Sequence, residues 1–314
     1  MMDMLPVLER YGLIPAVKVS DAADAVPICE ALVRGGLPVA EFTFRTPAAE
    51  DAIKRTADAL PELALGAGTV LTVDQAERAV KAGAKYIVAP GFNPKVVGWC
   101  VDNGITVLPG VASGSEIEAA MGLGIKAVKF FPAEQLGGLA AIKALSGPYF
   151  EMKFVPTGGV SEKNLADYLA FPKVMACGGS WFTKEEHVAA KAWDKVEAAA
   201  RTAVGITLGF EVTHVGVNAS GGEDGLAIAR RFSALFGWPL KDGNASAFSG
   251  SGVEVMKGGG RGANGHISVG VNNLARAKAY LEAKGVVFVP PIPGSKAAYI
   301  EEEIGGFAVH LLQK

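Results

Sequence analysis

The chain has 314 residues, half of them hydrophobic, which is more than one typical domain needs and enough for a large core. Its net charge is −2, and acidic and basic residues are interspersed without a basic stripe, which argues against a nucleic-acid partner. The first 12 residues combine charged side chains with no long apolar run, so they predict neither a signal peptide nor a membrane span.

From Leu13 to Cys177 the sequence repeats one unit, in which a short apolar strand is followed by an amphipathic, alanine-rich helix. The predicted strands are 13–19, 38–44, 63–69, 86–89, 106–109, 127–131, 152–156 and 174–177, and the clearest helices are 22–34, 48–60, 73–81 and 115–121. Strict alternation implies parallel strands joined by right-handed crossovers, and eight such units predict an α/β fold, a (β/α)8 TIM barrel.

An open doubly wound sheet is the alternative architecture for this pattern. It usually carries a glycine-rich loop after the first strand. The first strand here ends in Lys18-Val19-Ser20-Asp21, which provides no such loop, so the barrel is favoured.

The second strand carries three polar side chains on one face. Side chains alternate along a strand, so Glu41, Thr43 and Arg45 share a face while Phe42 and Phe44 take the other. With the apolar face against the helices, a carboxylate, a hydroxyl and a guanidinium point into the barrel. The alternative is an edge strand on which Glu41 and Arg45 form a solvated pair.

The stretch Gly124–Pro132 reads as a buried parallel strand that contains one charged group near its end, Lys129. Burying an ammonium is unfavourable unless it is paired or gives up its proton, and a neutral amine attacks carbonyl groups. The strand therefore suggests Schiff-base chemistry, and the alternative is a lysine whose ammonium reaches solvent.

Glycine-rich turns follow the last two predicted strands of the repeat, at Pro156-Thr157-Gly158-Gly159 and Cys177-Gly178-Gly179-Ser180. Barrel enzymes commonly bind a phosphate there through backbone N–H groups. We therefore expect a phosphate to bind at Thr157, Gly158, Gly159, Gly179 and Ser180.

Several motifs together resemble one enzyme family. They are Glu41-Phe-Thr-Phe-Arg45, Gly66-Ala-Gly-Thr69, Ala89-Pro90-Gly91, Lys129-Phe-Phe-Pro132, Pro156-Thr157-Gly-Gly159 and Gly178-Gly-Ser180. Over residues 5–205 the chain resembles the class I aldolases of 2-keto-3-deoxy-6-phosphogluconate and 4-hydroxy-2-oxoglutarate. The resemblance implies that Lys129 forms the Schiff base, Glu41 shuttles protons, and Arg45 and Thr69 hold the pyruvate-derived carboxylate. It also implies that Pro90 belongs to the substrate site, that no cofactor is needed, and that the chain forms a homo-oligomer, a trimer.

The expected function is cleavage of a phosphorylated sugar acid or a keto acid to pyruvate and an aldehyde, a lyase reaction on a small molecule. Two alternatives remain open: a phosphosugar isomerase or epimerase that uses Glu41 as base, and a metabolite-binding sensor with a regulatory C-terminal domain. The scattered cysteines predict reduced thiols and a cytoplasmic setting. They are Cys29, Cys100 and Cys177.

After the barrel, residues 184–204 predict one helix and residues 205–209 a linker. The expected domains are therefore 1–205 and 210–314. The C-terminal pattern is βαβββ written twice: strands near 213–218, 238–241, 245–249 and 252–257 with a helix at 224–236, then strands near 266–271, 286–289, 297–302 and 307–312 with a helix at 273–284. This topology resembles the vicinal oxygen chelate fold of glyoxalase I and the extradiol dioxygenases.

Four polar residues of the C-terminal domain interrupt predicted strands: His214, Glu254, His266 and His310. In the family that the topology resembles, metal ligands stand at these four kinds of position, although the last is usually glutamate. Imidazole and carboxylate groups suit a divalent metal such as Zn²⁺, Ni²⁺, Mn²⁺ or Fe²⁺. The alternative is three histidines that bond to the backbone, in a domain kept for packing or oligomerisation.

Overall fold

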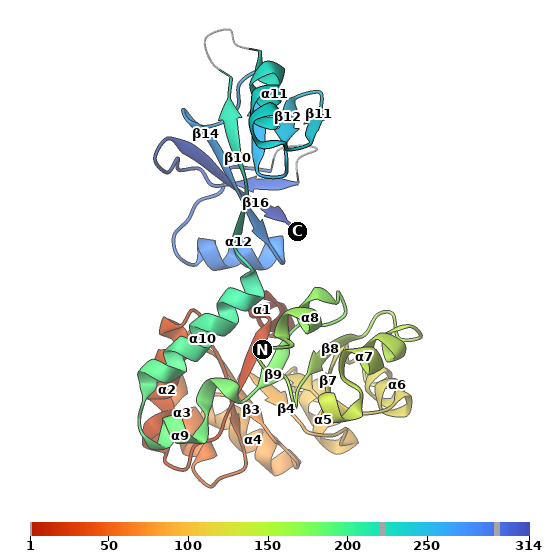
Figure 1. Ribbon diagram of the computed structural model, residues 1–314. Coiled ribbons are helices and arrows are strands. Elements are labelled where there is room, and N and C mark those ends of the chain that lie inside the picture. The colour runs from red at the N-terminus through yellow and green to blue at the C-terminus, as the bar shows by residue number, and fades with distance from the viewer. Residues whose placement is uncertain (1, 220–223, 292–295) are drawn as a thin grey trace. The chain divides into compact units, whose positions relative to one another are not determined.

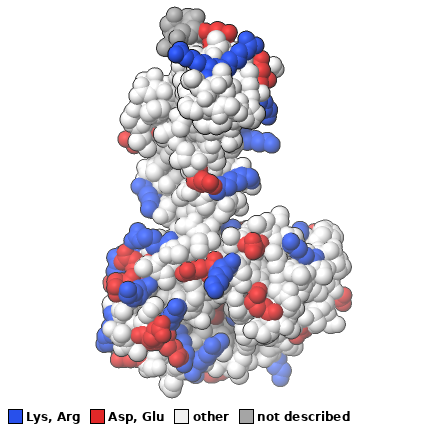
Figure 2. Space-filling view, in the orientation of Figure 1, with Lys and Arg blue, Asp and Glu red and all other residues white. Residues whose placement is uncertain are grey.

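The computed structural model describes residues 2–219, 224–291 and 296–314, which form two compact units that divide between Thr207 and Leu208 (Figure 1). Within the described residues, no helix is both long and apolar enough to cross a membrane. On the face of the first unit that Figure 2 displays, basic and acidic side chains are intermixed, as the composition predicted.

The first unit is built on parallel strands that close into a ring. The strands are β1 (Leu13–Val17), β2 (Val39–Thr43), β3 (Ala64–Gly68), β4 (Tyr86–Val88), β5 (Thr106–Leu108), β6 (Gly110–Val111), β7 (Ala127–Phe130), β8 (Lys153–Pro156) and β9 (Cys177–Gly179). Hydrogen bonds join them in the orders β5-β4-β3-β2-β1-β9 and β6-β7-β8.

Two connections complete the ring. Pro109 separates β5 from β6, and its carbonyl accepts from Lys129 N at 2.9 Å, so β5 and β6 act as one interrupted strand beside β7. Isolated bridges pair Phe154 with Val174 and Thr157 with Gly178, which joins β8 to the segment that contains β9. The predicted (β/α)8 barrel is confirmed.

Helices alternate with these strands and cover the outside of the barrel (Figure 1). They are α1 (Leu5–Tyr11), α2 (Ala25–Arg34), α3 (Ala49–Ala59), α4 (Val73–Ala82), α5 (Pro94–Asp102), α6 (Gly114–Gly122), α7 (Gly138–Ser146) and α8 (Leu165–Ala170). Side chains fix several helix starts. At α6, the N-cap Ser113 accepts through Oγ from Glu116 N, and the Glu116 carboxylate accepts from the N–H of the preceding residue, Ala112, an arrangement similar to a capping box.

The end of the barrel differs from the sequence prediction in two places. The single helix expected at 184–204 is wrong, because Lys191, at φ 51°, separates α9 (Glu185–Ala189) from α10 (Trp193–Leu208). The linker expected at 205–209 is mostly helix, because α10 continues through Gly205, where a glycine costs only about 1 kcal/mol. Gly209 follows at φ 62°, the left-handed conformation that favours glycine.

Within its described residues, the second unit is built on one seven-stranded sheet and has two similar halves. The first half contains β10 (Glu211–Asn218), α11 (Gly225–Phe236), β11 (Leu240–Asp242), β12 (Ser246–Ser249) and β13 (Val253–Met256), and the second contains β14 (Gly265–Val271), α12 (Leu274–Glu282), β15 (Ala297–Tyr299) and β16 (Phe307–Gln313). The strand order is β11-β12-β13-β10-β14-β16-β15. The strand expected at 286–289 is reduced to a bridge between Phe288 and Ile300.

The register of this sheet decides which side chains share a face. Gly216 pairs with both Glu254 on β13 and His266 on β14, and Ser268 pairs with both His214 and His310. All four predicted metal ligands therefore lie on one face. Residues of the opposite parity, Ala247 and Val255, pack under α11 in a buried apolar cluster with Ala229, so the helix covers the other face.

Candidate active site of the barrel and a histidine cluster

Glu41 lies on β2 inside the barrel and is only 4% exposed. Its carboxylate lies against the backbone of β3, because a Cβ built on Gly68 would approach Glu41 Oε1 to 1.7 Å. Only glycine at that position leaves room for the carboxylate. Burial raises the pKa of Glu41, while the charges of Lys129 and Arg45 oppose that rise.

Lys129 lies on β7 and is only 5% exposed. Its Nζ is 5.0 Å from the centroid of the Phe131 ring. Burial lowers the pKa of Lys129, the charge of Glu41 opposes that change, and the positive charge of Arg45 adds to it. The site thus contains a carboxyl group whose pKa is raised and an amine whose pKa is lowered, so the neutral forms of both groups are favoured relative to their ordinary states in water.

Arg45 and Thr69 follow the ends of β2 and β3. Arg45 Nε donates to Thr69 Oγ1 at 3.2 Å. Thr69 has φ 56°, a left-handed conformation that is uncommon for a residue other than glycine and that concentrates at functional sites. The guanidinium is therefore oriented by a residue whose own backbone conformation is unfavourable.

A cavity of about 640 Å³ opens among these strand ends. Its lining contains most of the predicted residues: Glu41, Arg45, Lys129, Thr157, Gly158, Gly159, Gly179 and Ser180. Thr69 and Pro90 are not in that lining. Thr69 is connected to the cavity through its hydrogen bond with Arg45. Pro90 packs closely against the backbone of Gly110, because a Cβ built on Gly110 would lie only 2.1 Å from the Pro90 carbonyl oxygen.

The two glycine-rich segments border the same cavity. Gly158 and Gly159 have φ 94° and 81°, so the turn after β8 requires glycine. Gly178 and Gly179 belong to β9 itself rather than to a turn, and Ser180 is the first residue after the strand. A Cβ on Gly179 would lie 1.8 Å from the Trp181 ring, so the absence of a side chain lets the indole cover this segment.

Sequence reasoning missed several side chains that line the cavity, among them Lys18, Phe131, Trp181 and Glu185. Lys18 could have been identified, because it stands two residues after Ala16 and therefore shares its inward face. Phe131 and Trp181 lie beyond the ends of β7 and β9, Trp181 in a short 3-10 helix (Trp181–Thr183), where strand alternation no longer predicts the direction of a side chain.

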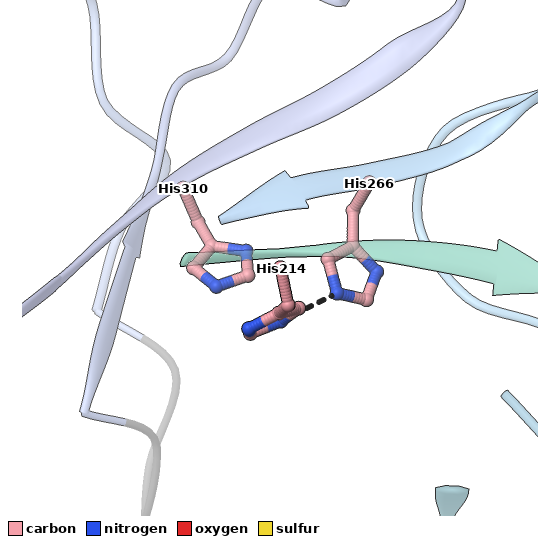
Figure 3. A group of neighbouring side chains, drawn as sticks. All are labelled: His214, His266 and His310. Atoms are coloured by element: carbon pink, nitrogen blue, oxygen red, sulfur yellow. Dashed lines mark hydrogen bonds between the residues drawn. The ribbon is translucent and has the colours of Figure 1, made fainter. Parts of the chain in front are cut away.

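In the second unit, His214, His266 and His310 converge from β10, β14 and β16 (Figure 3). Their ligand nitrogens lie within 4.8 Å of one another. The Nε2 atoms of His214 and His266 are 3.2 Å apart, and Glu254 Oε2 is 3.1 Å from each of them. The structure thus brings all four predicted residues together.

Neighbouring side chains hold this cluster in place. Ser246 Oγ donates to Glu254 Oε1 at 2.5 Å, and Gly216 leaves room for the His266 ring, which a Cβ there would meet at 1.9 Å. Hydrogen bonds from His214 and His266 hold the pKa of Glu254 far below its usual range. Burial, together with the other two histidines, lowers the pKa of His310 to about 4, so that imidazole is neutral at pH 7.

Comparison with known proteins places residues 6–199 in a family described as KDPG and KHG aldolase. The 2-dehydro-3-deoxy-phosphogluconate aldolase of Treponema pallidum is 48% identical over 198 residues, which are 63% of this chain and 94% of that protein. The KHG/KDPG aldolase of Escherichia coli K12 is 40% identical over 63% of this chain and 93% of its own.

A solved structure gives the same match in three dimensions. The KDPG aldolase of Legionella pneumophila, captured with pyruvate as a covalent carbinolamine intermediate, aligns with a TM-score of 0.63 at 36% identity. The alignment covers 64% of this chain and 98% of that one.

Proposed function

The chain belongs, through residues 6–199, to the KDPG and KHG aldolase family, and on that premise we propose how its barrel works as a class I aldolase. The substrates are 2-keto-3-deoxy-6-phosphogluconate, cleaved to pyruvate and glyceraldehyde 3-phosphate, and 4-hydroxy-2-oxoglutarate, cleaved to pyruvate and glyoxylate. The observation that carries the proposal is the burial of Lys129 and Glu41 in one cavity with opposite pKa shifts. Membership of this family favours a lyase over the isomerase and the sensor.

The reaction begins at Lys129. Its neutral amine attacks the C2 carbonyl of the substrate, and loss of water from the carbinolamine leaves an iminium. Glu41 delivers the proton that this water needs in order to leave. The raised pKa of Glu41 supports this role, because burial makes its carboxylate easier to protonate than a carboxylate in water.

Cleavage uses the same two groups. Glu41, now a carboxylate, takes the proton of the C4 hydroxyl, the C3–C4 bond breaks, and its electrons move into the iminium to form an enamine. The aldehyde leaves, C3 is protonated, and water releases pyruvate and the free amine. The iminium is the electron sink, so the barrel reaction needs no cofactor.

Two further groups of residues place the substrate. Arg45, oriented by Thr69, matches the carboxylate next to C2 because a guanidinium offers paired donors. Thr157, Gly158, Gly159, Gly179 and Ser180 border the cavity where the backbone lacks large side chains, which suits a distal phosphate. Pro90 contributes by supporting the strand beside β7.

Borohydride reduction in the presence of pyruvate tests the Schiff base directly. Reduction should add one adduct per chain, and peptide mapping should place it on Lys129. Mapping to Lys126 or Lys153 instead would refute the assignment.

A charge placed in the phosphate segment should separate the two substrates. We expect Ser180→Asp to raise KM for the phosphorylated substrate about tenfold or more through like-charge repulsion. Cleavage of 4-hydroxy-2-oxoglutarate, which lacks a phosphate, should change much less. Steady-state kinetics on both substrates measures the difference, and equal losses would mean that the phosphate binds elsewhere.

For the second unit we propose a vicinal oxygen chelate-like domain that binds one divalent metal through His214, Glu254, His266 and His310. Metal–ligand bonds of about 2.0–2.2 Å place adjacent ligand atoms about 3 Å apart. The separations of 3.1 and 3.2 Å among His214, His266 and Glu254 match that spacing. A metal held there would act as a Lewis acid on a bound oxygen.

Metal analysis of protein purified without a histidine tag tests this site. We expect about one equivalent per chain, lost in His214→Ala/His266→Ala, while pyruvate trapping by the barrel persists. His187→Ala, which changes the histidine of α9, is the matched control and should keep the metal. Apoprotein that cannot be reconstituted with Zn²⁺, Ni²⁺, Mn²⁺ or Fe²⁺ would refute the site.

The cellular setting and the oligomeric state complete the proposal. The three cysteines are buried and form no disulfide, which supports a reducing, cytoplasmic setting. We also propose a homotrimer, which sedimentation of the purified protein tests.

A further inference from the structure

Lys18 occupies a position between the two halves of the proposed active site. It follows β1, which pairs with β2 on one side and with β9 on the other. Ala16 is the register partner of Glu41, and Pro15 is the partner of Gly179. Lys18 therefore extends the inward row of β1 beyond Ala16 and lines the same cavity as Glu41 and Ser180.

The ammonium of Lys18 is paired with a carboxylate that also borders this cavity. Lys18 Nζ lies 2.5 Å from Glu185 Oε1, at the start of α9. The two side chains are 47% and 78% exposed, so solvent screens the pair and the interaction is weak. This hydrogen bond lowers the pKa of Glu185, which is therefore ionised at neutral pH.

We propose that Lys18 is a second binding group for the distal phosphate. In the free enzyme its ammonium pairs with Glu185, and when the substrate binds it pairs with the phosphate instead. The inference rests on the proposed function, because it assumes that the phosphate binds beside Gly179 and Ser180. A phosphate dianion carries more charge than a carboxylate and accepts charge-assisted hydrogen bonds from the same ammonium. Lysine suits this exchange, because its compact charge is carried on a flexible stem that can reach either partner.

This exchange gives the two residues opposite effects on ligand binding. Lys18 attracts the distal anion, whereas Glu185 competes for Lys18 and repels the anion. Substrates with a terminal phosphate gain from Lys18, and substrates that end near C4 do not reach it. Lys18 is thus a specificity-determining residue, outside the Lys129–Glu41 chemistry.

Inorganic phosphate is the probe for the test, as a competitive inhibitor of cleavage of the phosphorylated substrate, whose distal phosphate would occupy the same segment. We expect Lys18→Met to raise the inhibition constant of phosphate about fivefold to tenfold, the effect of one charge-assisted contact, and Lys18→Arg to restore most of the affinity. Glu185→Gln should lower that constant about twofold to threefold, because it removes the competitor. KM for the phosphorylated substrate should move in the same directions, with smaller changes in kcat.

Lys54→Met is the matched control, because it also breaks an exposed lysine–carboxylate pair, with Asp58 on α3. Lys54→Met should change neither the inhibition constant of phosphate nor KM for the phosphorylated substrate. If the Lys18–Glu185 pair only anchors α9, both variants weaken phosphate binding alike, which overturns the proposal. If phosphate inhibits wild type and all variants equally, Lys18 has no role, although the phosphate segment stands. If phosphate does not inhibit wild type, the proposed phosphate segment fails and the role of Lys18 fails with it, while trapping at Lys129 still tests the aldolase.

Discussion

Lys129→Met will produce a folded barrel that forms no adduct with pyruvate and borohydride and cleaves neither substrate at a measurable rate. Methionine matches the length and apolar stem of lysine, and the neighbouring Phe131 ring packs equally well against a thioether. The variant lacks the amine, so neither the iminium nor the enamine can form. Intact mass after reduction and turnover of both substrates measure the loss.

Lys126→Met is the control for this experiment, because Lys126 is an exposed lysine next to the same strand. It should keep both the adduct and the activity. Stability is expected to stay close to that of wild type or to rise in Lys129→Met, because the substitution removes a buried amine. Residual turnover within tenfold of wild type would contradict the Schiff-base assignment.

Glu41→Gln will lower turnover about 10²- to 10⁴-fold, the range expected when a general acid–base group is lost. Glutamine has the same shape and fits against Gly68, but its amide cannot exchange protons with the substrate. Exchange of the pyruvate methyl protons in D₂O reports the same step without an aldehyde, because it requires the enamine. NMR measures the exchange rate.

Gly68→Ala provides a second variant in which Glu41 itself is unchanged. Its new Cβ would lie 1.7 Å from Glu41 Oε1, so the carboxylate must move, and a similar loss is expected. Glu50→Gln changes an exposed carboxylate that pairs with Arg78, and it should leave exchange unaffected. Exchange within fivefold of wild type in Glu41→Gln would show that another group moves the protons.

The sequence predicted the barrel well where side-chain pattern determines structure. Alternation of polar and apolar residues over 41–45 predicted that Glu41 and Arg45 face the interior of the barrel, and both line the cavity, although Arg45 lies just after the end of β2. The break at Lys191 could not be predicted, because no glycine or proline marks it. Gly178 and Gly179 predict a turn, but both belong to β9, because a strand needs only backbone hydrogen bonds and the interior side here must stay small beside Thr157 and Trp181.

The sequence allowed the chemical types of the site residues to be predicted, but not the distances between them. Four ligand-type residues could be identified in the C-terminal sequence, whereas their convergence depends on the register that pairs Gly216 with both Glu254 and His266. Likewise, the pair between Lys18 and Glu185 joins residues 167 positions apart in the sequence. Such contacts arise only when the ring of strands closes.

The repeated halves of the second unit have a consequence for how such a cluster can originate. β10 and β14 are the first strands of the two halves, and they pair with each other in antiparallel orientation. Each half supplies the histidine–glutamate cluster with one residue from its first strand and one from its last. The cluster therefore lies on an approximate twofold axis, where a symmetric dimer of single βαβββ chains would place the same groups. Covalent fusion of the halves frees them to diverge, so Glu254 and His310, which occupy equivalent places, can differ in charge. A symmetric ancestor would have had to carry either both carboxylates or both imidazoles.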